Sequence, residues 1–475
     1  MLSFVALGHS PLAMSEGHRA IPAWEMLDSG DWLVPTLFGQ PYLRKPPGVQ
    51  WAMALSSLIF GRTEFAVRAV SAGAIVVGAL LSWFFARRWF GTAQHARTCA
   101  LAAGLLFPLT PLFWYPGRSA EIESLHNTCV LAVLLTGLDL LIPGERSRRQ
   151  TLGAVAAVAT AIAAAALTKG PAAAPALIGL VVAVALVTRS LNPLKRPAFW
   201  IALAAAGVIL AGVGTAISGH VKSLALPPVT QSPAGFLWDT GKLGSILSLP
   251  ISSLVSALPG SLLLPWALRR CAPPHARALA LTIGISLFLY TALGVSNNRY
   301  VMPVLTLVPI AAAYAFRGFA EAVAEDNRLW VRLGRLALLH RAWIPAVVLT
   351  MAAAAHHIWL ELRRESISGR ATGVALAGAL PDGSTIIANQ MIEYRPETFH
   401  YASHVSRERG EGLTIRWIPP AVTPPTGSVY VALRNPPDPA VRSTQFELDT
   451  FANPNRPIVF RGIVHRFEVE VIGPR

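Results

Sequence analysis

Long apolar windows separated by short polar segments run along most of the chain. Each window approaches the ~20 residues that an α-helix needs to cross a bilayer, and few charges interrupt them. The pattern therefore predicts a mainly α-helical, polytopic membrane domain. The windows that predict crossings are residues 69–86, 98–115, 125–142, 151–168, 171–188, 198–218, 243–268, 278–295, 301–316 and 342–360.

Two apolar segments near the start do not fit a crossing. Residues 49–60 are too few, and they predict a helix that lies in the membrane interface. Residues 1–14 are also too few, and no basic segment with a small-residue cleavage site accompanies them. We therefore expect that the first transmembrane helix is truncated at the start of this sequence.

The pattern changes after residue 362, where short β-branched runs alternate with Pro and Gly turns. A helix is predicted over 369–380. The predicted strands are residues 384–389, 413–417, 428–433 and 458–471. We expect two domains: a transmembrane domain of residues 1–362, with its first outer loop at 15–68, and a small α/β domain of residues 363–475.

Composition supports a membrane protein, because 53% of the residues are hydrophobic and 14% are charged, against about 25% charged in an ordinary soluble domain. The net charge of +15 would also suit a nucleic-acid-binding protein. However, the Arg and Lys residues cluster in short loops between apolar windows, where the positive-inside rule places them. We therefore attribute the charge to topology and expect no nucleic-acid partner.

The charged loops also predict the orientation of the chain in the membrane. One alternate set of loops carries most of the Arg and Lys residues, so we expect that set in the cytoplasm. These loops are residues 87–97, 146–149, 189–196, 269–277 and 328–341. The opposite set of loops ends with everything after residue 361. The chain is therefore predicted to be a multi-pass inner-membrane protein with an extracytoplasmic C-terminal domain.

The outer loops hold the residues that suggest chemistry. Glu16, His18 and Arg19 combine a carboxylate, an imidazole and a guanidinium, a set suited to a base with a phosphate-binding partner. A solvated or capping cluster at a helix end is the simpler interpretation of the same residues. Arg44 and Lys45, held by two following prolines, could grip a lipid phosphate or anchor the loop to anionic headgroups.

Three further outer turns carry charge next to apolar helices. Arg118 and Glu123 flank one turn, where they are either functional or joined as an ion pair. Lys169 lies in the turn "LTKGP", and a lysine on the outer side suggests a phosphate ligand. Arg299 and Tyr300 place a cation and a phenol at a helix start, although such a tyrosine is more commonly an interfacial anchor.

No Cys or His pair in the sequence has the spacing of metal ligands, so no metal site is indicated. The sequence also contains no Walker loop, dinucleotide fingerprint or G-x-S-x-G elbow in a strand-turn-helix context. The cofactor therefore stays unknown, and a divalent metal requirement is left open.

Residues 25–47, "EMLDSGDWLVPTLFGQPYLRKPP", are followed by the Arg118 turn, "LTKGP" and "RYVMP". In this order and spacing they resemble the undecaprenyl-phosphate aminoarabinose transferase and protein O-mannosyltransferase family of GT-C membrane glycosyltransferases. The resemblance covers roughly the whole membrane domain. It implies a GT-C fold and transfer of a sugar from a polyprenyl-phosphate donor to a hydroxyl of a lipid, glycan or protein acceptor.

The resemblance also implies roles for single residues. The family's first outer loop normally reads Asp-Glu-x-Arg-Tyr, and Ser15 stands at the aspartate position here. We expect Glu16 to act as the base instead, with His18 and Arg19 as its partners and Glu123 as the alternative base. The expected ligands of the donor phosphate are Arg19, Arg44, Lys45, Arg118, Lys169, Arg299 and Tyr300.

A base on the acceptor, without a covalent intermediate, predicts inversion at the transferred carbon. The rival hypothesis is a catalytically silent membrane protein that binds or transports a polyprenyl phosphate. It would use the same cations and need no base.

Overall fold

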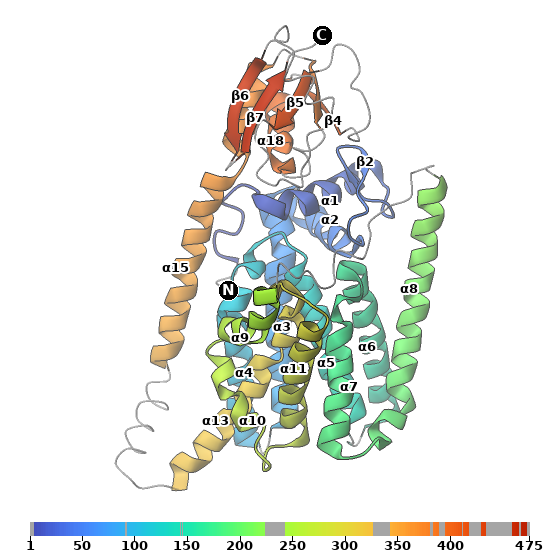
Figure 1. The fold of residues 1–475 in the computed structure, drawn as a ribbon, viewed down its shortest axis with the longest axis vertical. Helices are drawn as coiled ribbons and strands as arrows, with labels where there is room; N and C mark the ends of the chain where they lie inside the picture. Colours follow the sequence, from blue (N-terminus) through green and yellow to red (C-terminus); the bar gives the residue numbers. More distant parts are fainter. Residues whose placement is uncertain are drawn as a thin grey trace.

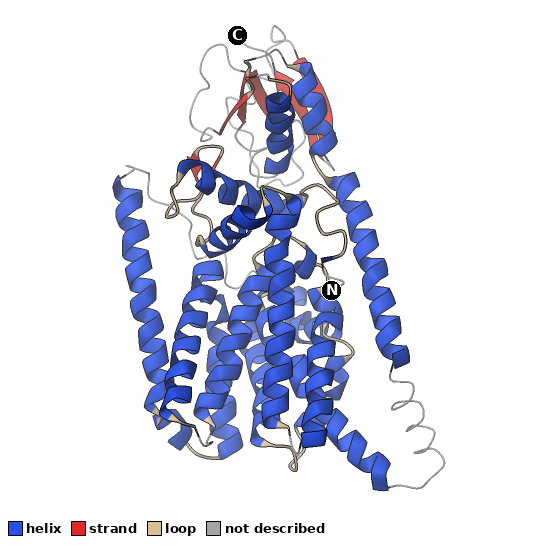
Figure 2. Ribbon diagram, turned by 180° about the vertical axis from the view of Figure 1, so that it is seen from behind, coloured by secondary structure: helices blue, strands red, loops and turns tan. Residues whose placement is uncertain are grey.

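A computed structural model of the chain describes residues 4–90, 93–142, 144, 146–223, 243–325, 343–380, 383–388, 395–410, 412–417, 429–433, 458–464 and 467–472. The molecule is elongated, with a helical bundle at one end and an α/β domain at the other (Figure 1). A layer of two shorter helices lies between them, as the view from behind also shows (Figure 2). The predicted basic loop at 328–341 lies outside the described residues.

Apolar helices form the bundle, as the hydrophobic windows predict. Five of the described helices are long and apolar enough to cross a membrane, or up to seven if each of two bent pairs is one span. The bundle helices are α3 (Glu64–Trp89), α4 (Ala93–Leu109), α5 (Glu123–Leu141), α6 (Arg148–Lys169), α7 (Ala174–Thr188), α8 (Pro197–Ser223), α9 (Leu243–Ser256), α10 (Leu264–Ala267), α11 (Pro274–Ala292), α12 (Met302–Leu305), α13 (Val308–Glu325) and α15 (Trp343–Ile367). The chain is thus a multi-pass membrane protein.

Three of the predicted crossings are not single straight helices. The segment 243–268 divides into two helical parts bent by 92°, at a break that contains Pro259. The segment 98–115 bends by 51° where Pro111 follows α4, and 301–316 divides into α12 and α13. Proline removes a backbone donor and disfavours the helical conformation of the preceding residue, so a uniformly apolar window still breaks.

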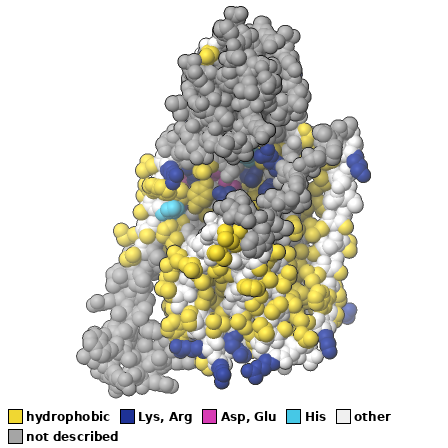
Figure 3. Space-filling view, viewed as in Figure 1, with side chains coloured by type: hydrophobic (Ala, Val, Ile, Leu, Met, Phe, Trp, Pro, Cys, Tyr) yellow, Lys and Arg dark blue, Asp and Glu magenta, His cyan; other side chains and the backbone are white. Residues whose placement is uncertain are grey.

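Short 3₁₀ helices lie at the turns between these elements. They are η2 (Met14–Glu16), η3 (Pro111–Phe113), η4 (Pro116–Arg118), η5 (Gly170–Ala173), η6 (Asn192–Lys195), η9 (Gly260–Leu263) and η10 (Asn298–Tyr300). Basic side chains gather at the end of the bundle away from the α/β domain, and a second group lies with acidic side chains beneath that domain (Figure 3). The polar outer turns therefore face the α/β domain.

The layer between the bundle and the α/β domain comes from the predicted first outer loop. Its elements are α1 (Gly17–Ser29), β1 (Thr36–Leu37), β2 (Gln40–Pro41) and α2 (Gly48–Phe60). α2 packs against both α1 and α3, and it exposes Leu58 and Ile59. The prediction of a short helix over 49–60 is confirmed.

The α/β domain contains, among its described residues, a five-stranded sheet of order β4-β3-β5-β7-β6. β4, β3 and β5 are parallel, whereas β7 is antiparallel to both of its neighbours. The elements are α16 (Arg370–Ala379), β3 (Thr385–Ala388), α18 (Pro396–Glu408), β4 (Thr414–Trp417), β5 (Val429–Leu433), β6 (Ile458–Val464) and β7 (Phe467–Ile472). The helix over 369–380 and the first three strands are confirmed. The run 458–471 is a hairpin, not one strand, and α18 was not predicted.

The α/β domain packs directly on the layer that contains α1 and α2, which we call the outer layer. Phe399 of α18 shares a buried apolar cluster with Ile21 of α1. The Tyr401 hydroxyl accepts a hydrogen bond from the Leu12 backbone N–H at 2.6 Å and donates one to Glu64 Oε1 at 3.0 Å. Because α15 also continues past the expected boundary at 362 and 363, the two predicted domains are joined by a helix and by a packed interface.

Candidate functional site

Several of the predicted site residues meet where the outer ends of α5 and α6 lie beside η10. The Lys169 ammonium is 3.5 Å from Glu123 Oε1 and donates to the Arg299 carbonyl at 3.1 Å. It also lies 4.8 Å from the centre of the Tyr300 ring. The Arg299 guanidinium is 3.9 Å from the same Glu123 oxygen. Two cations thus converge on one carboxylate, and a phenol lies beside them. We call these four residues the charged cluster.

Local sequence explains why these side chains converge. Lys169 is the last residue of α6, and Gly170 follows it with φ +66°, a conformation that other residues rarely adopt. The chain therefore turns at once and leaves the lysine at the helix end. Glu123 begins α5, and the Asn297 side chain accepts a hydrogen bond from the Arg299 backbone N–H at 3.0 Å. Each residue is positioned by a helix end or turn.

The start of α2 brings Lys45 to the same place. A Cβ on Gly48 would lie only 2.7 Å from the Leu167 carbonyl oxygen, so the glycine allows α2 to pack against the end of α6. Burial and the nearby Arg19 lower the pKa of Lys45, and Glu123 partly opposes them. Lys45 is therefore part of this charged cluster. Arg44 is exposed, and its neighbour Tyr42 is buried.

A second carboxylate adjoins the first. Glu121 is buried and accepts a hydrogen bond from the Ser15 hydroxyl. Burial, together with the charge of Glu123, raises the pKa of Glu121, while Arg19 opposes the shift. Two carboxylates close together share protons because both cannot ionise without repulsion. Ser15, at the family's aspartate position, therefore contacts a neighbouring carboxylate here.

Arg19 and His18 lie on the first turn of α1, and both are buried. Arg19 Nη1 donates to the Tyr42 hydroxyl at 3.3 Å, and the His18 and Tyr42 rings are 5.9 Å apart. The hairpin that carries Tyr42 thus holds the start of α1 against the charged cluster. The structure brings together the expected residues Arg19, Lys45, Glu123, Lys169, Arg299 and Tyr300, with His18 at their edge.

Glu16 faces a different set of partners from the one expected of a base. It accepts two hydrogen bonds from Arg68, at 2.8 and 2.9 Å, and one from the Ala120 backbone N–H at 2.8 Å. Burial alone would raise its pKa, but the charges of Arg68 and Arg364 outweigh burial and lower the pKa to about 2. Both oxygens of Glu16 already accept hydrogen bonds from these partners, so neither is open to an acceptor hydroxyl, which argues against Glu16 as the base.

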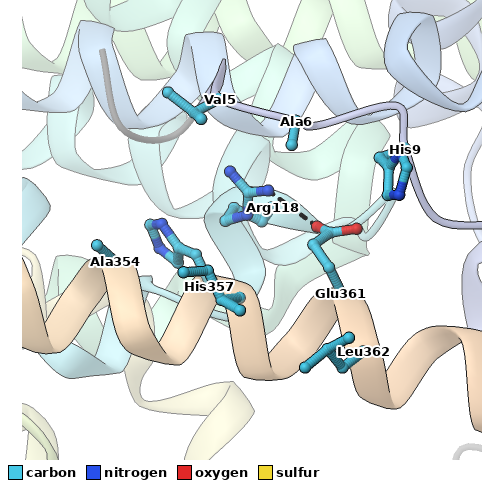
Figure 4. Close-up of a pocket in the computed structure, with 9 residues that line it drawn as sticks. Val5, Ala6, His9, Arg118, Ala354, His357, Glu361 and Leu362 are labelled. Atoms are coloured by element: carbon cyan, nitrogen blue, oxygen red, sulfur yellow. Dashed lines mark hydrogen bonds and ion pairs between the residues drawn. The ribbon is translucent and has the colours of Figure 1, made fainter.

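Arg118, like Glu16, is paired with residues outside the charged cluster. Its Nη2 is 2.8 Å from Glu361 on α15, so the alternative of an Arg118–Glu123 ion pair is wrong. Figure 4 shows Arg118 pointing toward Glu361 at a cavity of about 300 Å³, with His9 and His357 on its walls. Arg364 donates to the Arg118 carbonyl at 2.7 Å. These contacts tie α15 to η4, and they separate Arg118 from the cations around Glu123.

Several buried polar atoms on the helices that carry or adjoin the charged cluster have no hydrogen-bond partner. Within the described part of the chain they include Glu123 Oε2 and both amide groups of Gln50 and Asn127. Gln50 is in the first turns of α2, and Asn127 lies one turn after Glu123. Buried polar groups are normally satisfied, so these atoms are groups that a bound polar ligand or water would satisfy. Gln50 and Asn127 escaped the sequence analysis, although an amide inside an apolar window was the available signal.

Among the described residues no group of three or more His, Cys, Asp or Glu side chains is placed to hold a metal ion.

A family model described as dolichyl-phosphate-mannose-protein mannosyltransferase matches residues 44–214. The undecaprenyl phosphate-alpha-4-amino-4-deoxy-L-arabinose arabinosyl transferase of Aeromonas salmonicida is 28% identical over 295 residues, which cover 59% of this chain and 51% of that protein. An uncharacterized protein of Aquifex aeolicus is 34% identical over 161 residues, or 34% of each chain. The chain spans about half the length of the arabinosyl transferases it matches.

The fold also matches a solved structure over nearly its whole length. ArnT from Cupriavidus metallidurans in the apo state aligns with a TM-score of 0.71 and 19% identity, covering 99% of this chain and 95% of that chain. The structure of the same protein bound to undecaprenyl phosphate has the same TM-score and identity. At this identity the match establishes the fold, and the family model and curated relatives add the sequence evidence. The chain therefore has the fold of ArnT, and over parts of its length its sequence is similar to the aminoarabinose transferases and the protein O-mannosyltransferases, as the resemblance predicts.

Proposed function

We propose that this chain transfers a sugar from a polyprenyl-phosphate carrier to a hydroxyl acceptor at the outer face of the inner membrane. The observation that carries the proposal is the convergence of Lys169 and Arg299 on Glu123, with Lys45 nearby. These groups lie at the end of the bundle that faces the α/β domain. They combine a phosphate-binding set of cations with a candidate base in a GT-C fold.

The cations would stabilise the leaving group. When the bond to the sugar breaks, negative charge develops on the carrier phosphate, and preorganised cations in a partly buried site stabilise that charge. Lys169, Arg299 and Lys45 would hold the phosphate, with the Tyr300 hydroxyl beside them. Arg19 lies next to these residues. Arg44 is exposed and would make only a peripheral contact with the phosphate. The undecaprenyl phosphate named for the Cupriavidus structure supports a carrier of this class.

The base that we propose is Glu123. Its Oε2 is buried and has no hydrogen-bond partner in the described residues, whereas the Glu16 carboxylate is fully engaged. Phosphate binding by Lys169 and Arg299 would relieve Glu123 of its present partners and leave it to accept the proton of the acceptor hydroxyl. Glu121 and His18 would then act as supporting groups.

The stereochemical outcome of the transfer follows from these roles. The base serves the acceptor and no covalent intermediate is required, so the sugar configuration inverts. The transferred unit is a hexose or a pentose, and the names of the curated relatives make 4-amino-4-deoxy-L-arabinose the first sugar to test. The C-terminal α/β domain would lie outside the cytoplasm. Protease digestion of spheroplasts tests that orientation, because only an external domain is cleaved in intact cells.

The function is tested with purified, detergent-solubilised protein. It is incubated with a panel of radiolabelled polyprenyl-phosphate sugars and membrane extract, and label that leaves the carrier is followed. We expect turnover with one donor and a loss of about 10²–10⁴-fold in Glu123→Gln, the usual contribution of a general base. Asp31→Asn is the control, because Asp31 pairs with His220 at 2.8 Å in the outer layer and not with the charged cluster.

Two outcomes would redirect the proposal. Undiminished turnover in Glu123→Gln would remove Glu123 as the base. No turnover of any donor by the wild-type protein, together with saturable binding of undecaprenyl phosphate, would favour the silent lipid-binding or lipid-transporting alternative.

A further inference from the structure

A cleft of about 670 Å³ lies between the outer layer and the C-terminal domain. A single face of α1 forms one wall, and a single face of α18 forms another. Both faces repeat at positions i, i+3, i+4 and i+7, a spacing that aligns side chains along one side of a helix. The α1 face is Ile21, Trp24, Glu25 and Asp28, and the α18 face is His400, Ser403, His404 and Arg407.

Contacts between α1 and α18 position the two walls. The Trp24 and His400 rings lie 4.9 Å apart at the point where the two helices meet, and the Trp24 indole donates to Ser57 at 3.1 Å. The residues on either side of His400, Phe399 and Tyr401, are buried in apolar clusters that also contain Ile21 and Trp24 of α1. The two helices are therefore joined by packing along the base of the cleft.

The lining mixes hydroxyl groups, charges of both signs, aromatic rings and aliphatic side chains. Ser403 and Thr414 contribute hydroxyls, Trp24 and Phe38 contribute aromatic rings, and the aliphatic side chains are Ile21, Leu413 and Ile415. The charged side chains are Glu25, Asp28, Arg62, Arg407 and Glu408. A lipid phosphate would call for a surplus of cations, and an acyl chain would call for an apolar lining. This mixture instead suits a hydroxyl-rich molecule of low net charge, and the volume is within the roughly 300–1,000 Å³ of small-molecule sites.

We propose that this cleft binds the saccharide part of the acceptor. The inference rests on the proposed transferase function and assigns its second substrate a site. α1 links the two places, because Arg19 in its first turn adjoins the charged cluster and Asp28 in its last turn lines the cleft. At 1.5 Å per residue these positions are about 14 Å apart. An acceptor oligosaccharide longer than a disaccharide would span that distance, with its terminal hydroxyl directed toward Glu123.

The test compares variants of the full-length protein. Ser403→Trp and Thr414→Trp fill the cleft from two sides, and Ala375→Trp places the same side chain on the exposed side of α16, outside the cleft. The acceptor is the glycolipid fraction of an envelope extract, and the donor is the radiolabelled polyprenyl-phosphate sugar. We expect the acceptor KM of both cleft variants to rise by about tenfold or more, the loss of one or two hydrogen bonds. Donor KM and kcat should stay unchanged, and Ala375→Trp should match the wild type.

An unchanged acceptor KM in both cleft variants would overturn the proposal, and so would competition by glycan-free envelope protein, which would indicate a peptide in the cleft. If the wild-type protein transfers no sugar, the proposed function fails. Saccharide binding by the cleft is then tested separately, by a binding measurement. Labelled oligosaccharide released from the same extract should then bind the wild-type protein and Ala375→Trp but not Ser403→Trp. Equal binding by all three would refute the cleft.

Discussion

The Glu16 carboxylate and the Arg68 guanidinium form a two-point ion pair in which the side chains are 1% and 0% exposed. The pair joins the start of α1 to α3. Arg68 also donates to the carbonyls of Leu7, Ser10 and Pro11 at 2.7–3.0 Å. Its geometry suits a fixed structural element, because every hydrogen bond positions the residues that precede α1. This geometry argues against Glu16 as the base of the proposed reaction.

Removing the charge of Glu16 is expected to destabilise the protein. Glu16→Gln leaves the Arg68 guanidinium buried without its ionic partner, which typically costs about 3–5 kcal/mol. Thermal unfolding in detergent should show a large decrease in Tm. Asp28→Asn is a matched control, since the Asp28–Arg62 pair is exposed and such pairs contribute at most about 1 kcal/mol. Equal Tm values for both variants would contradict a structural role for the buried pair.

The same pair predicts an acid limb in the stability profile. The pKa of Glu16 is lowered from 4.5 to about 2 in the folded protein. Its stabilisation is therefore complete above pH 4.5 and is lost as pH falls toward 2, a difference of about 3 kcal/mol. Glu16→Gln should lose less stability than the wild type over that range, as measured by urea unfolding at successive pH values. Parallel profiles would show that other groups dominate acid unfolding.

Glu397 should give the opposite pH dependence. This carboxyl is fully buried at the start of α18, 3.3 Å from Arg395, and burial raises its pKa to about 8, which the Arg395 charge only partly opposes. A raised folded pKa contributes stability that is present below the unfolded pKa of 4.5 and lost as pH rises through 8. We expect Tm to fall between about pH 4.5 and pH 8 in the wild type, and to fall less over that range in Glu397→Gln. Identical slopes would contradict this assignment.

Lys169 should matter for binding of the carrier. Lys169→Met removes one charge-assisted contact to a phosphate and should weaken binding of undecaprenyl phosphate by about tenfold. Lys222→Met is the control, because Lys222 is exposed at the end of α8. Binding is measured by titration of the purified protein in detergent. If both variants bind the carrier as tightly as the wild type, the cations around Glu123 do not form the phosphate site.

The Tyr401 hydroxyl should fix the C-terminal domain in place. Tyr401→Phe keeps the ring but deletes the hydrogen bonds with Leu12 and Glu64, with an expected loss of about 1–3 kcal/mol. Hydrogen exchange should increase in α18 and in the residues before α1, and it should stay unchanged in α5. Uniform exchange across the protein would show that the domain is held by its apolar contacts alone.

The sequence by itself determined the membrane class, most helices of the bundle and most strands of the C-terminal sheet. Apolar windows and β-branched runs are local signals. Each transmembrane segment must itself be long and apolar enough for the bilayer, and each strand must itself have the composition of a strand. The polar α18 and the hairpin at 458–471 lacked such a signal. The sequence also indicated Lys169, Arg299 and Glu123, since a charge beside an apolar helix is costly wherever it lies.

Only the tertiary structure decided which charges meet. Arg118 pairs with Glu361 on a distant helix, Glu16 pairs with Arg68, and Glu123 is left to Lys169. Sequence proximity suggested Arg118 with Glu123, and Glu16 with His18 and Arg19. Partner choice depends on how helices far apart in the chain pack together, and a shift of one helical turn would exchange the partners. For that reason the identity of the base could not be read from the sequence.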